Sequence, residues 1–234
     1  MQVWGVTDIG LVRKENQDAY LVRESGGHTI CVVCDGMGGA AGGRLASQIA
    51  TETFVDELER LLAPGMEPEQ LLSVSARAVF AANQAVREAA AESEAYQNMG
   101  TTLVAAVSYA GGTVVTNVGD SRAYHVTREG ITRVTKDHSL VERMVDRGDI
   151  TAEEARRHPS RNLITRALGP DADAQCDGYI CPMESGEYLL LCTDGLVNTV
   201  TDQEMLFEVI HGAEPDTSLD RMLEIAKKQG APDN

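Results

Sequence analysis

Four aspartates stand where an apolar run begins or ends, and carboxylate oxygens are the ligands that hard divalent cations prefer. Asp35 and Asp194 each follow an apolar run and precede a glycine, Asp18 precedes such a run, and Asp233 is followed by Asn234. Each could be an ordinary turn residue, because Asp-Gly is a common turn dipeptide. However, a carboxylate at the end of a buried strand lies at the rim of the sheet. Several such groups can converge there on a pair of cations.

The cysteines do not indicate a zinc site or a disulfide framework. The chain has five of them, an odd number without regular spacing. Cys31 and Cys34 form a C-x-x-C pattern inside a β-branched run that is typical of a buried strand. Positions i and i+3 of a strand face opposite sides, so the two sulfurs cannot easily share a metal or a bridge. We expect buried structural thiols.

Composition limits the classes of partner. The chain has 234 residues and 43% hydrophobic content, which favours one domain over residues 1–234. Its formal charge of -16 produces a field that repels phosphate backbones and anionic lipids, so nucleic acid and membranes are poor candidate partners. The sequence has no apolar run of the roughly 18 residues that a membrane span needs, and no signal-like leader. We expect a cytoplasmic protein.

The elements that must position the aspartates are strands and helices in blocks. Apolar alternation predicts strands at residues 3–7, 19–22 and 29–34, and helical periodicity predicts helices at 43–62 and after Pro68. A second block predicts an antiparallel meander, followed by short helical, strand and helical segments: strands 101–109, 113–118, 122–126 and 131–134; helical 138–157; strands 163–168, 174–180 and 188–192; helices 202–210 and 218–229. The blocks do not alternate β-α-β-α, so we predict an α+β sandwich with helices outside.

Two other ligand-binding patterns in the sequence lack residues that their ligands require. The strand at 29–34 runs into a glycine-rich segment and then a helix, which is the outline of a dinucleotide fingerprint. Asp35 would put a negative charge against the pyrophosphate, and Asp56, the acidic residue about twenty positions on, lies inside a predicted helix. A calcium loop starting at Asp171 also fails, because Cys176 stands where glycine is required and Pro182 where the bidentate glutamate should be.

Eight motifs occur in this order along the chain: RKENQD (13–18), VCDGMGG (33–39), GTT (100–102), GDSR (119–122), DHSL (137–140), TRALG (165–169), TDGL (193–196) and DN (233–234). Together they resemble the motifs of metal-dependent, type 2C protein phosphatases, in the bacterial form that partners eukaryotic-type Ser/Thr kinases. The resemblance runs from about Gly5 to the last residue, and it implies an α-β-β-α sandwich with a metal centre in the cleft between two mostly antiparallel sheets. It also implies a movable flap at about residues 137–168, here called the flap segment.

The resemblance implies a ligand set for two Mn²⁺ or Mg²⁺ ions. Asp35 would bridge the ions, Gly36 would offer its backbone carbonyl, and Asp194 and Asp233 would complete the set. Asp18 would act nearby, through water bound to metal. All-oxygen sites favour these hard cations over zinc, which prefers histidine and cysteine. A bridging water activated by two cations can attack phosphorus in line, so no covalent phosphoenzyme is required.

The resemblance also implies a phosphate-binding residue, a site for a third ion and a class of substrate. Arg13 matches the phosphate-binding arginine, whose guanidinium fork suits two phosphoryl oxygens. Asp120, together with Asp194, lies where bacterial members place a third, weaker metal. The implied function is hydrolysis of phosphoserine and phosphothreonine in proteins, opposing Ser/Thr kinases. The implied partners are phosphorylated proteins, including such a kinase and its substrates, and a monomer is the default state.

The chain departs from the family pattern in two places. Family members often carry a histidine in or just after the glycine-rich segment, but this chain has Met37 and Ala40 there, with Arg44 where glutamate is usual. His138 is the nearest alternative general acid. The family continues beyond the Asp-Asn pair into a final core strand, which this sequence lacks after Asn234. A pseudophosphatase that binds phosphoproteins without turnover is the alternative function, although such a decayed site would usually have lost a ligand.

Overall fold

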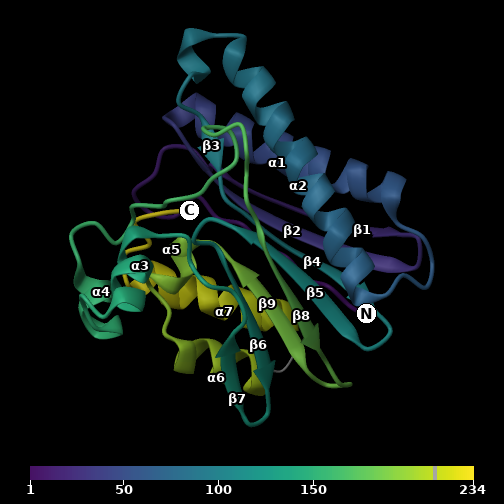
Figure 1. The fold of residues 1–234 in the computed structure, drawn as a ribbon. Coiled ribbons are helices and arrows are strands. Elements are labelled where there is room, and N and C mark those ends of the chain that lie inside the picture. Colours follow the sequence, from purple (N-terminus) through teal and green to yellow (C-terminus); the bar gives the residue numbers. More distant parts are fainter. Residues whose placement is uncertain (213–214) are drawn as a thin grey trace.

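Two antiparallel sheets lie face to face between helices in the computed structural model (Figure 1). The structure describes residues 1–212 and 215–234, but not the side chains of residues 40 and 41. The larger sheet has the order β1-β2-β4-β5-β8, and β3 pairs with β2 beside it. Its strands are β1 (Asp18–Ser25), β2 (His28–Met37), β3 (Gly100–Thr101), β4 (Leu103–Tyr109), β5 (Gly112–Val118) and β8 (Asp177–Pro182). The smaller sheet has the order β7-β6-β9, with β6 (Arg122–Thr127), β7 (Gly130–Arg133) and β9 (Tyr188–Cys192).

Helices cover the outer face of each sheet. Helices α1 (Ala40–Leu61) and α2 (Pro68–Ala91) pack on the larger sheet, with the 3₁₀ turn η1 (Glu94–Tyr96) after them. Helices α6 (Asp202–His211) and α7 (Pro215–Lys228) pack on the smaller sheet, next to the one-turn helix α5 (Asp194–Val197). Helices α3 (Leu140–Arg147) and α4 (Ala152–Arg157) lie together at one end of the molecule (Figure 1). The predicted α-β-β-α sandwich is confirmed.

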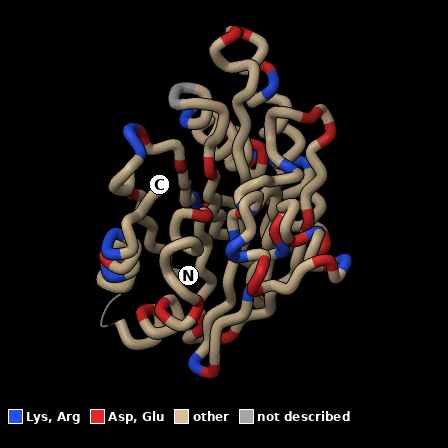
Figure 2. The backbone as a smooth tube through the Cα atoms, turned by 90° about the vertical axis from the view of Figure 1, so that its left-hand side faces the viewer, with Lys and Arg blue, Asp and Glu red and all other residues tan. Residues whose placement is uncertain are grey.

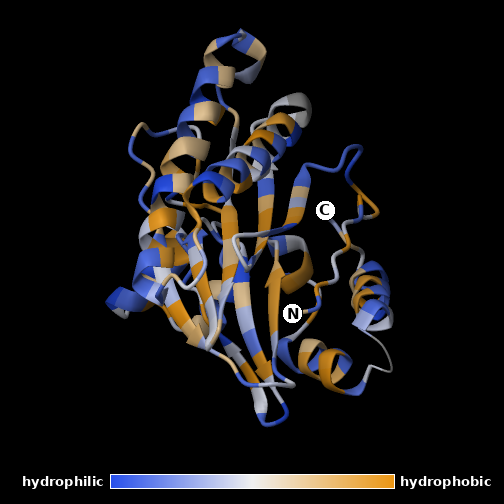
Figure 3. Cartoon of the chain, turned by 90° about the vertical axis from the view of Figure 1, so that its right-hand side faces the viewer, coloured by the Kyte–Doolittle hydropathy of each residue, from blue (hydrophilic) through white to orange (hydrophobic). Residues whose placement is uncertain are grey.

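Three hydrophobic layers hold the sandwich together. One lies between α1, α2 and the larger sheet and includes Phe54, Leu58 and Val79, and another lies between the smaller sheet and α6 and α7 around Tyr124 and Met205. The third lies between the sheets, where apolar side chains of β4, β5 and β6 meet. Figure 3 shows hydrophobic colour along the central strands and polar colour on the outer helix faces. Each sheet therefore buries both of its faces.

Local sequence explains where the main elements begin and end. Ser25 pairs with His28, so Gly26 and Gly27 form a two-residue hairpin loop, and both have the positive φ that a type I′ turn requires. Helix α2 begins with a capping box between Glu67 and Gln70. The strands predicted at 19–22 and 29–34 and the helix predicted at 43–62 are confirmed within a few residues as β1, β2 and α1.

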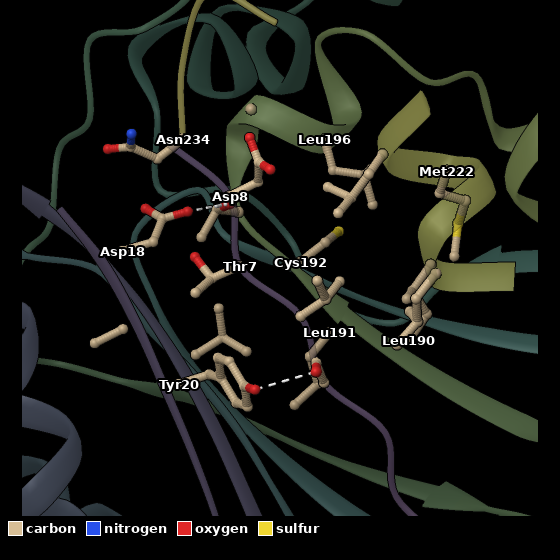
Figure 4. Close-up of a pocket in the computed structure, with 18 of the residues that line it drawn as sticks. Thr7, Asp8, Asp18, Tyr20, Leu190, Leu191, Cys192, Leu196, Met222 and Asn234 are labelled. Carbon is tan, nitrogen blue, oxygen red and sulfur yellow. Dashed lines mark hydrogen bonds between the residues drawn. The ribbon is translucent and has the colours of Figure 1, made fainter. Parts of the chain in front are cut away.

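Three predictions of elements were wrong. Residues 163–168 form no strand, only isolated bridges at Ile164 and Leu168. The predicted meander is divided, because β5 belongs to the larger sheet and β6 to the smaller one. Residues 3–7 are also not a strand, because an apolar groove of about 210 Å³ lies between this segment, β1, β9 and α7 (Figure 4). Among the described residues β9 pairs only with β6, so no strand fixes residues 3–7 from that side.

The acidic residues are spread along the chain, in helices and loops alike (Figure 2). None of the helices described is long and apolar enough to cross a membrane. The five cysteines are free thiols. Burial raises the pKa of the Cys31 thiol to about 11, as expected for a structural cysteine. The expectation of one domain over residues 1–234 includes residues 213 and 214, which lie outside the described residues, and it stays a prediction.

Candidate metal centre

Strand pairing places the first two candidate ligands opposite each other. The register of β1 and β2 pairs Asp18 with Asp35, so two residues that are 17 positions apart become cross-strand neighbours at the same end of the sheet. The backbone of Asp35 is fixed from the other side. Its N–H donates to Thr102 Oγ1 at 3.0 Å, and its carbonyl accepts from the Thr102 N–H at 2.9 Å and from Thr101 Oγ1 at 2.8 Å. These hydrogen bonds fix the backbone position from which the Asp35 side chain extends.

The glycine after Asp35 is required by close packing. A Cβ at Gly36 would lie 2.0 Å from the carbonyl oxygen of Gly43 in the first turn of α1, which no side chain tolerates. The Gly36 N–H donates to the carbonyl of Gln17 at 3.1 Å, and Ser47 Oγ donates to the same carbonyl at 2.6 Å. These contacts bring the start of α1 and the 13–18 segment against the end of β2.

Two distant segments complete the acidic cluster. Thr193, the residue that follows β9, donates its hydroxyl to Asp18 Oδ2 at 2.8 Å, which ties the two sheets together beside Asp194. A Cβ at Gly195 would lie 1.9 Å from the carbonyl oxygen of Asn234, so glycine lets the 233–234 segment pass directly over the start of α5. Asp194 and Asp233 are thus neighbours because of the Asp-Gly and Asp-Asn dipeptides.

The side chain of Asn234 fastens this segment to the loop that carries Arg13. Asn234 Oδ1 accepts from the Gln17 N–H at 2.9 Å, and Nδ2 donates to the carbonyls of Ile9 at 3.0 Å and Glu15 at 3.1 Å. Arg13 Nη2 in turn contacts Asp233 Oδ2 at 2.5 Å. Sequence reasoning missed the roles of Thr193 and Asn234, since a hydroxyl or amide beside an aspartate carries no distinct signal in one sequence.

The fifth aspartate lies in the crossover between the sheets. Asp120 follows Gly119, whose φ of +104° favours glycine, and Ser121 Oγ lies 2.6 Å from Thr102 Oγ1. The Thr102 side chain thereby joins the Asp35 backbone to the Asp120 loop.

These residues line one pocket of about 380 Å³. The lining includes six of the seven predicted site residues, whereas Asp18 lies beside it, held by Thr193. The flap segment contributes Asn162 and Ile164 to the same wall. The six are Arg13, Asp35, Gly36, Asp120, Asp194 and Asp233. His138 does not line this pocket; its ring is bound by Gly119 and Asp177 instead.

The carboxyl groups resist ionisation because they are buried among like charges. Burial, with the charges of Asp194 and Asp233, raises the pKa of Asp18 to about 7. Burial, with the charge of Asp194, raises the pKa of Asp120 to about 7. Burial, followed by the charge of Asp18, raises the pKa of Asp35 well above its usual 3.8, and burial with the charge of Asp233 raises that of Asp194. The cluster has too little positive charge of its own.

The donor set fits a hard divalent cation by its chemistry. All the clustered side-chain donors are carboxylate oxygens, which suit Mg²⁺ and Mn²⁺, and the raised pKa values indicate a site that a cation would stabilise. Within residues 1–212 and 215–234, however, no three His, Cys, Asp or Glu side chains are already arranged around one position. The carboxylate of Asp233 is held by Arg13 instead. We expect Arg13 to release Asp233 when a cation binds there.

Comparison with known proteins identifies the family. The chain matches the family described as Protein phosphatase 2C over residues 12–232. This match spans most of the sequence, so the chain belongs to the protein phosphatase 2C family. The family depends on metal ions, generally Mn²⁺ or Mg²⁺.

Bacterial relatives and solved structures agree with this assignment. The chain is 35% identical over 200 residues to the serine/threonine phosphatase stp of Listeria monocytogenes, covering 85% of this chain and 79% of that protein. It is 37% identical over 232 residues to the serine/threonine protein phosphatase PstP of Mycobacterium tuberculosis, covering 97% of this chain and 42% of the longer protein. The crystal structure of the serine/threonine phosphatase Stp1 from Staphylococcus aureus superposes with a TM-score of 0.91 at 33% identity, covering 97% of this chain and 89% of that one.

Proposed function

We propose that this protein hydrolyses phosphoserine and phosphothreonine in proteins, in a reaction that requires Mn²⁺ or Mg²⁺. The observation that carries the proposal is the meeting of four aspartates and one arginine from separate segments at a single pocket, with Asp18 held beside it by Thr193. The names of the bacterial relatives support the same activity. Because every acidic position is retained, we favour turnover over a pseudophosphatase that only binds phosphoproteins.

The proposed ligands of two ions are Asp35, the Gly36 carbonyl, Asp194 and Asp233, with Asp18 acting through water. Asp120 and Asp194 would hold a third, weaker ion. When bound, such ions lower the pKa of water and neutralise charge on a phosphoryl group. The protein's own contribution is to fix the carboxylates: Thr102 positions the Asp35 backbone, and Thr193 orients Asp18.

Arg13 is the proposed phosphate-binding group. Its guanidinium lies at the pocket and is partly exposed, so it can reach a phosphoryl group. In this structure it pairs with Asp233. A cation bound by Asp233 would free the guanidinium to donate two hydrogen bonds to phosphoryl oxygens, which suits its planar fork.

None of the described residues that line the pocket is a histidine, so no histidine is placed there to donate the leaving-group proton. Met37 lines the pocket where the family often has histidine nearby, and the ring of His138 is committed to other contacts. We therefore assign no histidine acid to this site. The proton source is expected to be solvent within the pocket.

The proposed substrates are phosphorylated proteins, including a eukaryotic-type Ser/Thr kinase and the proteins that it phosphorylates. The flap segment contributes Asn162 and Ile164 to the pocket wall, so it is the proposed determinant of substrate choice. A monomeric state and a cytoplasmic location remain predictions from the sequence.

The experiment compares phosphoserine, phosphothreonine and phosphotyrosine versions of one peptide after chelation and after addition of Mn²⁺, Mg²⁺ or Zn²⁺. We expect release of phosphate from the first two peptides only with Mn²⁺ or Mg²⁺. Asp35→Asn protein prepared in the same way controls for contaminating phosphatase. Equal hydrolysis after exhaustive chelation would contradict the proposal, and binding of the phosphopeptides without hydrolysis would support the pseudophosphatase instead.

A further inference from the structure

The loop that carries Asp120 is joined on both sides to the root of the flap segment. The Gly119 N–H donates to His138 Nδ1 at 3.1 Å, and the His138 N–H donates to the Gly119 carbonyl at 2.9 Å. On the other side of Asp120, Arg122 donates to both carboxylate oxygens of Asp137, with Nη2 to Oδ2 at 2.6 Å. Asp137 and His138, two consecutive residues of the flap segment, therefore hold Arg122 and Gly119, which lie on either side of Asp120.

The opposite edge of the same imidazole contacts the end of the flap segment. His138 Nε2 lies 3.2 Å from Asp177 Oδ2 in β8 and 3.0 Å from Arg166 Nη1, and Arg166 Nη1 donates to Asp177 Oδ1 at 2.8 Å. The Thr165 N–H also donates to the His138 carbonyl at 2.7 Å. One ring thus bridges the Asp120 loop, both ends of the flap segment and the larger sheet.

The hydrogen-bond pattern defines the state of the ring. Nδ1 accepts from the Gly119 N–H, so a neutral imidazole must carry its proton on Nε2 and donate it to Asp177. Burial lowers the pKa of His138, which favours this neutral form. The side chain is only 7% exposed and does not line the catalytic pocket, so contact with substrate does not explain its position.

We propose that the imidazole of His138 is a positioning group that couples the two ends of the flap segment to the Asp120 loop. A displacement of the flap segment pulls on the Gly119 N–H through Nδ1 and on Asp177 through the Nε2 proton, and Asp177 in turn holds Arg166 through Oδ1. The consequence for catalysis rests on the proposed function, because it requires Asp120 to bind a cation. The mechanical coupling does not depend on it and can be tested in metal-free protein.

Two substitutions separate the two edges of the ring. In His138→Asn, the amide oxygen can take the place of Nδ1 and still accept from the Gly119 N–H, but contact with Asp177 is lost. In His138→Gln, the longer side chain can reach toward Asp177, but the acceptor beside Gly119 is lost. His125→Asn is the matched control, since its shorter side chain breaks another histidine–carboxylate contact, between His125 Nε2 on β6 and Glu187 Oε2 at 2.9 Å, away from this junction.

Amide hydrogen exchange of the metal-free variants is the primary measurement, with melting temperatures recorded in parallel. We expect His138→Gln to increase exchange in the peptide containing residues 119–122, and His138→Asn to leave that peptide near wild type while exchange rises around residues 163–166. His125→Asn should change neither. Equal increases at both places in both His138 variants, or no increase at 119–122 in His138→Gln, would overturn the proposal.

The Mn²⁺ dependence of p-nitrophenyl phosphate hydrolysis gives the second measurement. We expect His138→Gln to raise the Mn²⁺ concentration for half-maximal rate by roughly 10-fold, as loss of a supporting contact does at other metal sites. His138→Asn should keep the wild-type Mn²⁺ requirement and instead raise KM for a phosphoserine peptide. An unchanged Mn²⁺ requirement in His138→Gln would contradict the coupling. If the wild-type protein hydrolyses neither substrate, the proposed function fails while the exchange result still decides the coupling.

Discussion

Arg13 and Asp233 form an ion pair across 220 positions of the chain, with Arg13 Nη2 2.5 Å from Asp233 Oδ2. The pair joins the proposed phosphate-binding group to a proposed metal ligand. It is partly exposed, so screening by solvent limits its own contribution to stability. Its importance lies instead in the change of partners that cation and phosphate binding would require.

Replacing Arg13 tests its role as the phosphate-binding group. We expect Arg13→Ala to raise KM for a phosphoserine peptide by about 10- to 100-fold, the effect of losing charge-assisted hydrogen bonds worth about 1.5–3 kcal/mol, with a smaller change in kcat. Arg13→Lys should recover only part of the loss, because an ammonium cannot reproduce the guanidinium fork. Steady-state kinetics at saturating Mn²⁺ provides the check. An unchanged KM in Arg13→Ala would remove Arg13 from the phosphate site.

Replacing Asp35 separates activity from stability. Asp35→Asn removes one charge from the proposed bridging position, so we expect kcat to fall by about 1,000-fold or more. The same change removes a buried like charge, and the melting temperature of the metal-free variant should therefore rise near neutral pH. Kinetics and thermal melting of the same preparation test both effects. A wild-type rate would remove Asp35 from the site, whereas a misfolded variant would show a lower melting temperature.

The acidic cluster should make the metal-free protein less stable as pH rises. Asp18 and Asp120 have folded-state pKa values raised from 3.8 to about 7. Their stabilising contribution is therefore fully present below 3.8 and is lost as pH rises through about 7. We expect the melting temperature of chelated protein to fall over this range, and added Mn²⁺ to restore more stability at the higher pH.

Asp120→Asn is the control for this pH effect, because it should flatten part of the decline without altering the rest of the acidic surface. A melting temperature that rises toward neutral pH in chelated protein, with no difference in Asp120→Asn, would show that the cluster ionises without penalty.

Asn234 should matter for substrate binding although it is not a predicted ligand. Asn234→Ala loses hydrogen bonds to Ile9, Glu15 and Gln17, and each net bond contributes about 0.5–1.5 kcal/mol. We expect a lower melting temperature and, because the loop carrying Arg13 loosens, a higher KM. Asn234→Asp keeps the acceptor for the Gln17 N–H but loses both donors, so it should be intermediate in melting temperature. Wild-type KM and melting temperature in Asn234→Ala would contradict this role.

The sequence was most informative where a local pattern decides structure. The β-branched run before Asp35 predicts the strand β2, and the periodic apolar residues after Gly43 predict α1, because these patterns reflect burial of one face or of the whole element. The Gly26-Gly27 hairpin likewise follows from local turn chemistry. The positions of the aspartates at strand ends could be predicted for the same reason.

Long-range relationships could not be predicted from the residues alone. The crossover at Gly119 looks like an ordinary hairpin turn in sequence, yet it moves the chain from one sheet to the other. Residues 3–7 have an apolar strand-like pattern, but a strand requires a hydrogen-bonded neighbour, and the groove separates them from β9. The ring contacts of His138 depend on three segments whose meeting no local pattern indicates.

Anomalous diffraction from crystals soaked in Mn²⁺ tests the central claim most directly. We predict two strong manganese peaks within bonding distance of the carboxylates of Asp35, Asp194 and Asp233, with Arg13 released from Asp233, and a weaker third peak beside Asp120. Peaks located elsewhere, or none beside Asp35 in crystals of protein that hydrolyses phosphoserine under the same conditions, would contradict the account.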